Sequence, residues 1–276
     1  MRQSPVIWGN KDAPLLVDYQ QNGFAIFSGQ GKQPPTAVLN NILQDIKSSS
    51  RPGRITEADG QIIRSQFDIH HQFPELLTIL LNHQLLQLAS TILGSEPLLY
   101  QSHVNFKLGQ QGKAYDWHAD YTYWRDHDGM LEPRAISVVI PLQSHQLNNG
   151  GLELLKQSHL AYYPCALDTD RPWKLDNIRH GRELNRLEKG LVPDEFINLI
   201  TPSMIHQAEM SLGDFLIMDA NTWHYSPDNN SNQDRVSLFI ILIAAETPFD
   251  ESKRNYRPGH ISCREGIPLR SFLHGS

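Results

Sequence analysis

A change of hydrophobic pattern about a third of the way along the chain constrains its fold more than any other feature. Before it, apolar residues recur at helical spacing over residues 74–94, with proline at the start and glycine at the end, which predicts one amphipathic helix. After it, short β-rich runs broken by turns follow at 98–108, 135–142, 151–155, 214–218 and 235–244. We therefore expect a mainly β fold with flanking helices, in which a helical layer backs an antiparallel sandwich or barrel.

The length of the chain predicts a single domain over residues 1–276, because β-barrels of this size are routinely one unit. Within it we expect the helical N-terminal layer at 1–95 and the β-core at 96–276. A helix ending at Asn22-Gly23 should lead into an early short strand. A polar stretch rich in Arg, Asp and Pro at about 166–205 is predicted to be an insertion, and a lid and a solvated surface loop are both open readings of it.

The charge balance excludes several classes of partner. Lys+Arg number 24 against Asp+Glu 30, so the net charge of −6 gives no electrostatic footprint for nucleic acid. The longest apolar runs, 76–81 and 238–245, fall well short of the roughly 20 residues of a membrane span. Two distant cysteines, Cys165 and Cys263, favour a reducing cytoplasm. We expect a small-molecule substrate, no nucleic acid and no membrane, with a homodimer left open.

A candidate metal site is carried by two segments of the sequence. In YDWHADYTYWRDHDGM, His118 and Asp120 are two residues apart, and such residues point to the same side at an extended strand end. His224 follows an apolar run in DFLIMDANTWHYS. Two imidazoles and one carboxylate leave three positions open, as non-haem Fe(II) oxygenases require. Zinc with the same ligands would serve a hydrolase, and this alternative stays open at this point.

Arg235 favours iron over zinc. It begins the apolar run RVSLFIILIA after His224, where a fixed guanidinium can hold the far carboxylate of a dicarboxylic acid in a bidentate pair.

On another expected strand Gln101, His103 and Asn105 alternate, so all three should point to one face. Most other histidines, including those at 70 and 71, are expected to be structural.

Two longer segments resemble a known family. WHADYTYWRDHDGMLEPRAISVVIPL resembles the W-H-x-D-[FY]-x-x-W-x-x-x-D-G-M stretch of the phytanoyl-CoA dioxygenase-like Fe(II)/2-oxoglutarate oxygenases, and YQSHVNFKLGQQGK resembles their Y-Q-x-x-[IV]-N-x-K. Within that family the chain is similar to ectoine hydroxylases and free-proline 4-hydroxylases. The resemblance implies a double-stranded β-helix, that is, a jelly-roll, cupin-like core. It also implies a dioxygenase that uses Fe(II), 2-oxoglutarate and O₂.

The resemblance also implies roles for individual residues. The metal ligands and catalytic residues would be His118, Asp120 and His224. The 2-oxoglutarate residues would be Arg235, Asn105 and Ser237, with Gln101 close by. Candidate substrate residues, as apolar walls or polar contacts, are Trp124, Tyr115, His103, Met218, Phe239 and Arg257. Related halogenases lack the carboxylate of Asp120, so its presence predicts hydroxylation and not chlorination.

Three pocket positions differ from the ectoine hydroxylases, which usually carry Arg at His103 and Phe at Tyr115 and Met218. The resemblance to both groups of hydroxylases implies a free amino acid or a cyclic amino-acid derivative, ectoine-like or proline-like, as the substrate. The alternatives are a tailoring hydroxylase of another secondary metabolite, a non-catalytic binding protein and the zinc hydrolase.

Overall fold

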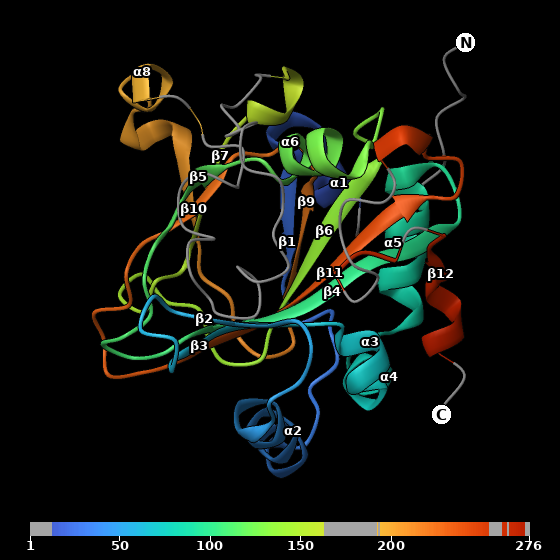
Figure 1. Cartoon of the computed structure of the whole chain (residues 1–276). Coiled ribbons are helices and arrows are strands. Elements are labelled where there is room, and N and C mark those ends of the chain that lie inside the picture. Colours follow the sequence, from blue (N-terminus) through green and yellow to red (C-terminus); the bar gives the residue numbers. More distant parts are fainter. Residues whose placement is uncertain (1–12, 163–191, 193, 254–260, 264, 274–276) are drawn as a thin grey trace.

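Two antiparallel sheets form the core of the protein. The structure, a computed structural model, describes residues 13–162, 192, 194–253, 261–263 and 265–273. The larger, eight-stranded sheet has the order β1 (Phe24–Phe27), β9 (Phe215–Asp219), β6 (Ala135–Pro141), β11 (Arg235–Ala244), β4 (Pro97–Lys107), β3 (Ile63–Phe67) and β2 (Arg54–Thr56), with β12 (Ile267–Pro268) also paired to β4. The smaller sheet has the order β5 (Tyr115–His118), β10 (His224–Ser226), β7 (Leu152–Leu155) and β8 (Ile205–Ala208). The larger sheet crosses the centre of Figure 1, with the smaller one beside it.

The chain passes back and forth between these two sheets. From β4 to β11 it goes from the larger sheet to β5, back to β6, out to β7 and β8, back to β9, out to β10 and back to β11. This alternation is the double-stranded β-helix, and all five β-rich runs predicted from the sequence are strands of it. A ligand pocket can therefore form between the sheets, in the mouth of the β-helix.

Strand β11 shows how the sequence pattern assigns residues to the two faces of the larger sheet. Val236, Leu238, Ile240 and Leu242 belong to a core cluster shared with the helices, whereas Phe239, Ile241 and Ile243 belong to a cluster shared with the smaller sheet. Because side chains alternate along a strand, Arg235 has the same parity as the second group. Its position in the sequence therefore directs it toward the space between the sheets.

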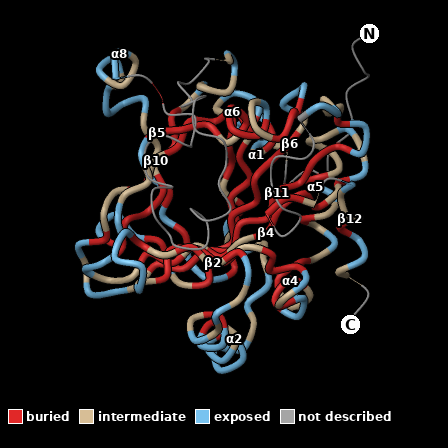
Figure 2. Tube along the Cα trace, viewed as in Figure 1, coloured by how far each residue is buried: buried red, intermediate tan, exposed pale blue. Residues whose placement is uncertain are grey.

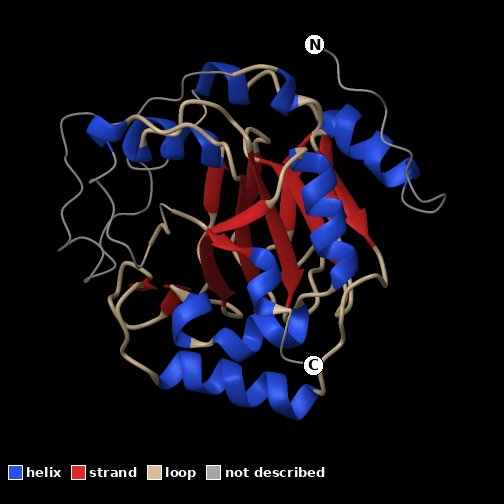
Figure 3. Ribbon diagram, turned by 90° about the vertical axis from the view of Figure 1, so that its right-hand side faces the viewer, coloured by secondary structure: helices blue, strands red, loops and turns tan. Residues whose placement is uncertain are grey.

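Helices cover the outer face of the larger sheet (Figure 3). These are α1 (Ala13–Asn22), α2 (Thr36–Ser48), α3 (Ile69–Gln72), α4 (Pro74–Leu80) and α5 (His83–Leu93). Elsewhere the chain forms α6 (Asp120–Tyr123) and α8 (Asp194–Ile197), a π-helical turn at Trp124–Asp128 and 3-10 turns at Ser158–Leu160, Pro202–Met204, Glu251–Lys253 and Leu269–Phe272. Buried leucines of α2, α4 and α5, such as Leu43, Leu77 and Leu85, pack in the same cluster as Leu238. Figure 2 shows the buried residues concentrated on the sheets and on the helix faces turned toward them.

The prediction of one helix over residues 74–94 is wrong, because the chain breaks there into α4 and α5, which are bent by 91°. Asn82 takes an extended conformation, and its Oδ1 accepts a hydrogen bond from the backbone N of Leu85 at 2.8 Å. Asparagine is a strong N-cap, so it starts a new helix. No single helix in the described ranges is long and apolar enough to cross a membrane. The bent pair of α4 and α5 reaches that length and apolar character only when its two helices are taken together.

The N-terminal region contributes more than helices, because β1, β2 and β3 extend the larger sheet. The predicted helix end at Asn22-Gly23 is confirmed, and β1 follows it directly. Gly23 has φ +86°, and a Cβ there would lie 2.6 Å from Oγ1 of Thr222, so both the backbone and the space require glycine. Most of the predicted insertion at 166–205, including 166–191, lies outside the described residues, and the lid therefore stays a prediction.

Candidate metal centre and active-site pocket

The predicted ligand residues lie together where the smaller sheet faces the larger one. His224 on β10 is directly opposite His118 on β5, and their ring centroids are 4.1 Å apart. Asp120 opens α6, and Ala119 before it is extended (φ −116°, ψ 130°), so the carboxylate returns to the side of His118. Oδ1 of Asp120 lies 3.8 Å from Nε2 of His118, and one ligand atom from each of the three residues lies within 4.8 Å of the others.

Backbone carbonyls orient both imidazoles of this triad. Nδ1 of His118 lies 2.6 Å from the carbonyl oxygen of Asp116, and Nδ1 of His224 lies 3.0 Å from that of Thr222. A carbonyl oxygen only accepts, so each Nδ1 carries the proton and each Nε2 presents a lone pair. Outer hydrogen bonds of this kind are typical of metal-binding histidines. The two imidazoles and the carboxylate therefore fit a divalent iron with open positions.

The pocket beside the triad is lined from both sheets. Of the residues predicted for co-substrate or substrate, it takes in Gln101, His103, Asn105, Tyr115, Trp124, Arg235 and Phe239. Ser237 and Met218 are not among its lining residues. The Ser237 hydroxyl lies behind Arg235 at 2.7 Å from Nε2 of His145, and Met218 packs in the apolar cluster between the sheets. Arg257 lies outside the described residues.

Arg235 is a buried cation at one end of this pocket, with 1% of its surface exposed. Its two terminal nitrogens donate to the hydroxyls of Ser226 at 3.2 Å and Ser237 at 3.4 Å, while its Nε is buried without a hydrogen-bond partner. No carboxylate in the described part of the chain pairs with it. Burial lowers the pKa of Arg235 to about 10, so the guanidinium stays charged at neutral pH. An uncompensated buried cation of this kind is suited to an anionic ligand.

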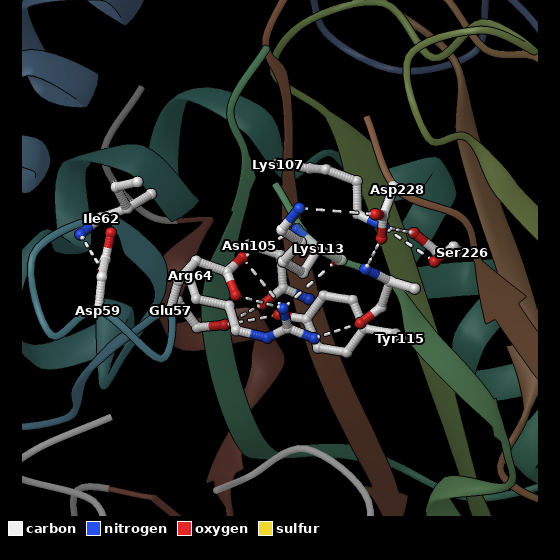
Figure 4. A network of polar contacts seen from close by, with 12 residues as sticks. Glu57, Asp59, Ile62, Arg64, Asn105, Lys107, Lys113, Tyr115, Ser226 and Asp228 are labelled. Carbon is white, nitrogen blue, oxygen red and sulfur yellow. Dashed lines mark hydrogen bonds and ion pairs between the residues drawn. The ribbon is translucent and has the colours of Figure 1, made fainter. Parts of the chain in front are cut away.

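Sequence reasoning did not assign two further basic residues, Arg64 and Lys107, which Figure 4 labels. Both act on or pair with Arg235. Arg64 on β3 donates to both carboxylate oxygens of Glu57, at 3.0 and 2.8 Å, and its guanidinium carbon lies 3.7 Å from the ring centroid of Tyr115. Lys107 pairs directly with Arg235 across β4 and β11. Lys107 is the final K of the Y-Q-x-x-[IV]-N-x-K segment, so its place in that motif could have marked it as a site residue. Arg64 lies outside both motifs, and no sequence pattern marked it.

Two effects act in opposite directions on the charge of Lys107. Burial, followed by Arg235 and Arg64, lowers its pKa to about 5. Its Nζ donates to the carbonyl oxygen of Ser226 at 2.9 Å, and it also contacts the Ser226 hydroxyl and the carbonyl oxygen of Pro227. Three oxygen partners favour the ammonium form. The pKa of Lys107 is therefore below that of an exposed lysine, and an anion bound beside Arg235 would raise it.

A hydrogen-bonded group from β3 orients Asn105. Ser65 lies opposite Asn105, and its hydroxyl donates to Oδ1 of that amide at 2.6 Å. The Ser65 hydroxyl also lies 3.1 Å from the hydroxyl of Tyr115. Because Oδ1 accepts from Ser65, the NH₂ group of Asn105 points the other way, where it can donate to an anionic ligand in the pocket.

Aromatic rings form the wall of the pocket on the substrate side. His103 is stacked between Phe67 and Phe239, with ring centroids 4.7 and 4.9 Å away. Its Nδ1 lies 3.2 Å from Nε2 of Gln101. Trp124 is 2% exposed and adds a further apolar surface. An apolar pocket with a few directed polar groups is the usual architecture for binding a small molecule.

A family model, proteins of known name and solved structures match this chain. The family model described as phytanoyl-CoA dioxygenase (PhyH) matches residues 19–237. The ectoine dioxygenase of Bordetella bronchiseptica is 29% identical over 96% of this chain and 89% of its own length, and that of Halomonas elongata is 30% identical over 93% and 80%. The crystal structure of EctD from S. alaskensis with 2-oxoglutarate and 5-hydroxyectoine matches with a TM-score of 0.78 and 24% identity, covering 95% of this chain and 88% of EctD. That similarity confirms the predicted β-helix fold.

Proposed function

We propose, because this chain belongs to the phytanoyl-CoA dioxygenase family, that His118, Asp120 and His224 hold Fe(II) and that Arg235 anchors 2-oxoglutarate in an O₂-dependent hydroxylase. The chain is an Fe(II)- and 2-oxoglutarate-dependent dioxygenase by its family. The observation that carries the residue assignment is the charged, carboxylate-free Arg235 in the same pocket as the triad. A zinc hydrolase would have no use for such a cation.

The side chains of the pocket have distinct tasks in this reaction. When bound, iron and 2-oxoglutarate supply the activation of O₂, with succinate and CO₂ as by-products. Arg235 and the Asn105 amide bind the dianion and fix its orientation relative to the triad. The stacked rings of Phe67, His103 and Phe239 exclude water from the wall of the pocket. The protein therefore positions the reactants and keeps the site dry.

The substrate we propose is a small zwitterion, either a free amino acid or a cyclic amino-acid derivative. Two similar curated proteins are ectoine dioxygenases, and the structurally similar EctD was solved with 5-hydroxyectoine. In this chain Trp124 and Phe239 offer apolar and π surfaces, which suit a compact ring or an ammonium group. Gln101 and His103 offer hydrogen bonds on one side of the pocket.

Succinate release in the presence of ectoine, proline and a panel of free amino acids tests this proposal. We expect at least one zwitterion to raise the rate well above that without substrate and to yield a product heavier by one oxygen atom. His118→Ala serves as the inactive control. Succinate release that no zwitterion stimulates, from protein that binds Fe(II) and 2-oxoglutarate, would remove the substrate proposal and leave the reaction class intact.

The oligomeric state and the cellular location of the protein are considered from the sequence. A cytoplasmic location fits the two distant cysteines, and a homodimer stays open. Light scattering of the purified protein tests the assembly directly. A mass of twice the 31.5 kDa chain would show a homodimer, and a mass of one chain would show a monomer.

A further inference from the structure

The combination of two histidines and one aspartate occurs a second time in the described part of the chain. Asp68, His70 and His71 lie where β3 leads into α3, and one ligand atom from each lies within 4.8 Å of the others. Nε2 of His70 is 3.7 Å from Oδ1 of Asp68, and the two imidazole centroids are 4.1 Å apart. The corresponding distances in the catalytic triad are 3.8 and 4.1 Å. The donor atoms of the two groups are therefore similarly spaced.

His70 supplies the observation that distinguishes this cluster from an ordinary surface group. Its side chain is 2% exposed, and its Nε2 is buried without a hydrogen-bond partner. Nδ1 is fixed at 2.7 Å from the hydroxyl of Ser102, which also accepts from the backbone N of His70 at 3.0 Å. If Nδ1 carries the proton, Nε2 presents a lone pair toward the carboxylate of Asp68. If Nε2 carries it, 3.7 Å is too long for a hydrogen bond to that carboxylate.

Asp68 is held in place by its backbone and by two side chains that contact its carboxylate. Its backbone lies in the left-handed region at φ +66°, and its backbone N donates to the carbonyl oxygen of Ser102 at 3.0 Å. Oδ2 accepts from the side chain of Gln72 at 3.2 Å, and Oδ1 lies 2.8 Å from Nδ1 of His71. The His71 side chain is 60% exposed, so an ion can enter the cluster from solvent.

We propose that Asp68, His70 and His71 form a second metal site, separate from the iron site, which binds a divalent late first-row cation such as zinc. Imidazole nitrogens and a carboxylate oxygen are ligands that zinc commonly takes, and water can complete a tetrahedron on the exposed side. The cation would replace the hydrogen bond between His71 and Asp68 and give the buried Nε2 of His70 a partner. The Ser102 hydroxyl holds the far nitrogen of His70, as outer partners do in metal sites.

The second site would stabilise the wall of the active-site pocket, although its own residues do not line the pocket. None of its three ligands lines the pocket. Phe67, the residue before Asp68, stacks on His103, and Ser102 lies between Gln101 and His103 on β4. A bound cation would therefore fix the end of β3 and the ring of Phe67. Its role would be structural, distinct from the proposed reaction.

Zinc stoichiometry tests the proposal. After equilibrium dialysis against buffered Zn²⁺ and metal analysis, wild-type protein should hold two zinc ions per chain, and His118→Ala should hold one. His71→Ala removes an exposed ligand and should also leave one. The matched control His83→Ala removes an exposed imidazole outside both clusters and should leave two.

A second variant and a second measurement distinguish the loss of a metal ligand from misfolding. Asp68→Asn keeps the size of the side chain and tolerates the left-handed backbone, and it should also reduce the stoichiometry to one. In His118→Ala, zinc should still raise the melting temperature, and adding His71→Ala should abolish that shift. Wild-type protein that holds a single zinc, or His71→Ala that still holds two, would overturn the proposal.

Discussion

Lys107 and Arg235 are directly paired across β4 and β11, so that two basic side chains are buried together. Arg235 lines the pocket, and Lys107 contacts Ser226, which also lines it. Lys107 and Arg235 are each 1% exposed. The buried carboxylate of Glu57 is already bound by both of its oxygens to Arg64. Burying charge without a counter-ion destabilises the folded chain, so this arrangement favours a bound dianion.

Binding of 2-oxoglutarate should be accompanied by proton uptake at neutral pH. In the free protein the pKa of Lys107 is lowered to about 5, by burial first, so at pH 7 the amine is mostly neutral. A dianion beside Arg235 favours the ammonium form and raises that pKa, so the complex binds more protons than the free protein. The affinity for 2-oxoglutarate should then increase as the pH falls from 8 to 6. Anaerobic calorimetry with Fe(II), in buffers of different protonation enthalpy, measures the uptake.

Lys107→Met distinguishes proton uptake at Lys107 from uptake at His145, whose pKa is also lowered by burial and by Arg235. The uptake should vanish in Lys107→Met if the lysine is the group that binds the proton. Wild-type binding without net proton uptake would show that the contacts with Ser226 and Pro227 already keep Lys107 charged in the free protein.

Arg235→Lys should weaken 2-oxoglutarate binding despite keeping the charge. The shorter, non-planar ammonium loses one of two parallel hydrogen bonds to the carboxylate, at about 1.5–3 kcal/mol for a charged hydrogen bond. The KM for 2-oxoglutarate should therefore rise roughly tenfold to a hundredfold. Arg134→Lys, at an exposed ion pair with Glu246, is the control and should leave it unchanged. An unaltered KM in Arg235→Lys would show that another group holds the carboxylate.

Asp120→Asn should weaken Fe(II) binding, because a neutral amide is a poorer ligand than a carboxylate. Anaerobic titration of Fe(II) with 2-oxoglutarate, followed by the visible charge-transfer band, measures the effect, and we expect the band to be lost or to need far more iron. Asp116→Asn makes the same change two residues before His118, at an exposed side chain, and keeps the carbonyl that orients the ring. Equal bands in the two variants would exclude Asp120 as a ligand.

His103→Arg should change which substrate is preferred without changing co-substrate binding. Arginine cannot reproduce the flat stack between Phe67 and Phe239, and it restores the residue usual in the ectoine hydroxylases. We expect kcat/KM for ectoine to rise relative to that for other zwitterions, with the KM for 2-oxoglutarate constant. Parallel kinetics on both substrate types provide the measurement, and an unchanged ratio would show that His103 does not select the substrate.

Local patterns carried much of the fold prediction. The β-rich run at 235–244 predicted a strand, and that strand is buried on both faces. Alternation along another predicted strand put Gln101, His103 and Asn105 on one side of β4. The helix over 74–94 failed because apolar spacing continued through Asn82, where side-chain capping of α5 outweighed periodicity. Met218 was expected to contact the substrate; it packs in the same apolar cluster as Trp124 and Phe239 but is not among the residues that line the pocket.

The sequence by itself determined the β-rich core, the two imidazoles and the carboxylate proposed as metal ligands at His118, Asp120 and His224, and a cation at the start of the last long strand. These follow from spacing within single segments, because a strand alternates its faces wherever it lies. Only the tertiary structure decided which segments meet. The pairing of β3, β4 and β11 brought Arg64 and Lys107 toward Arg235, and the β3–α3 corner buried His70 beside Asp68. Such contacts depend on pairing between distant strands, which no local pattern encodes.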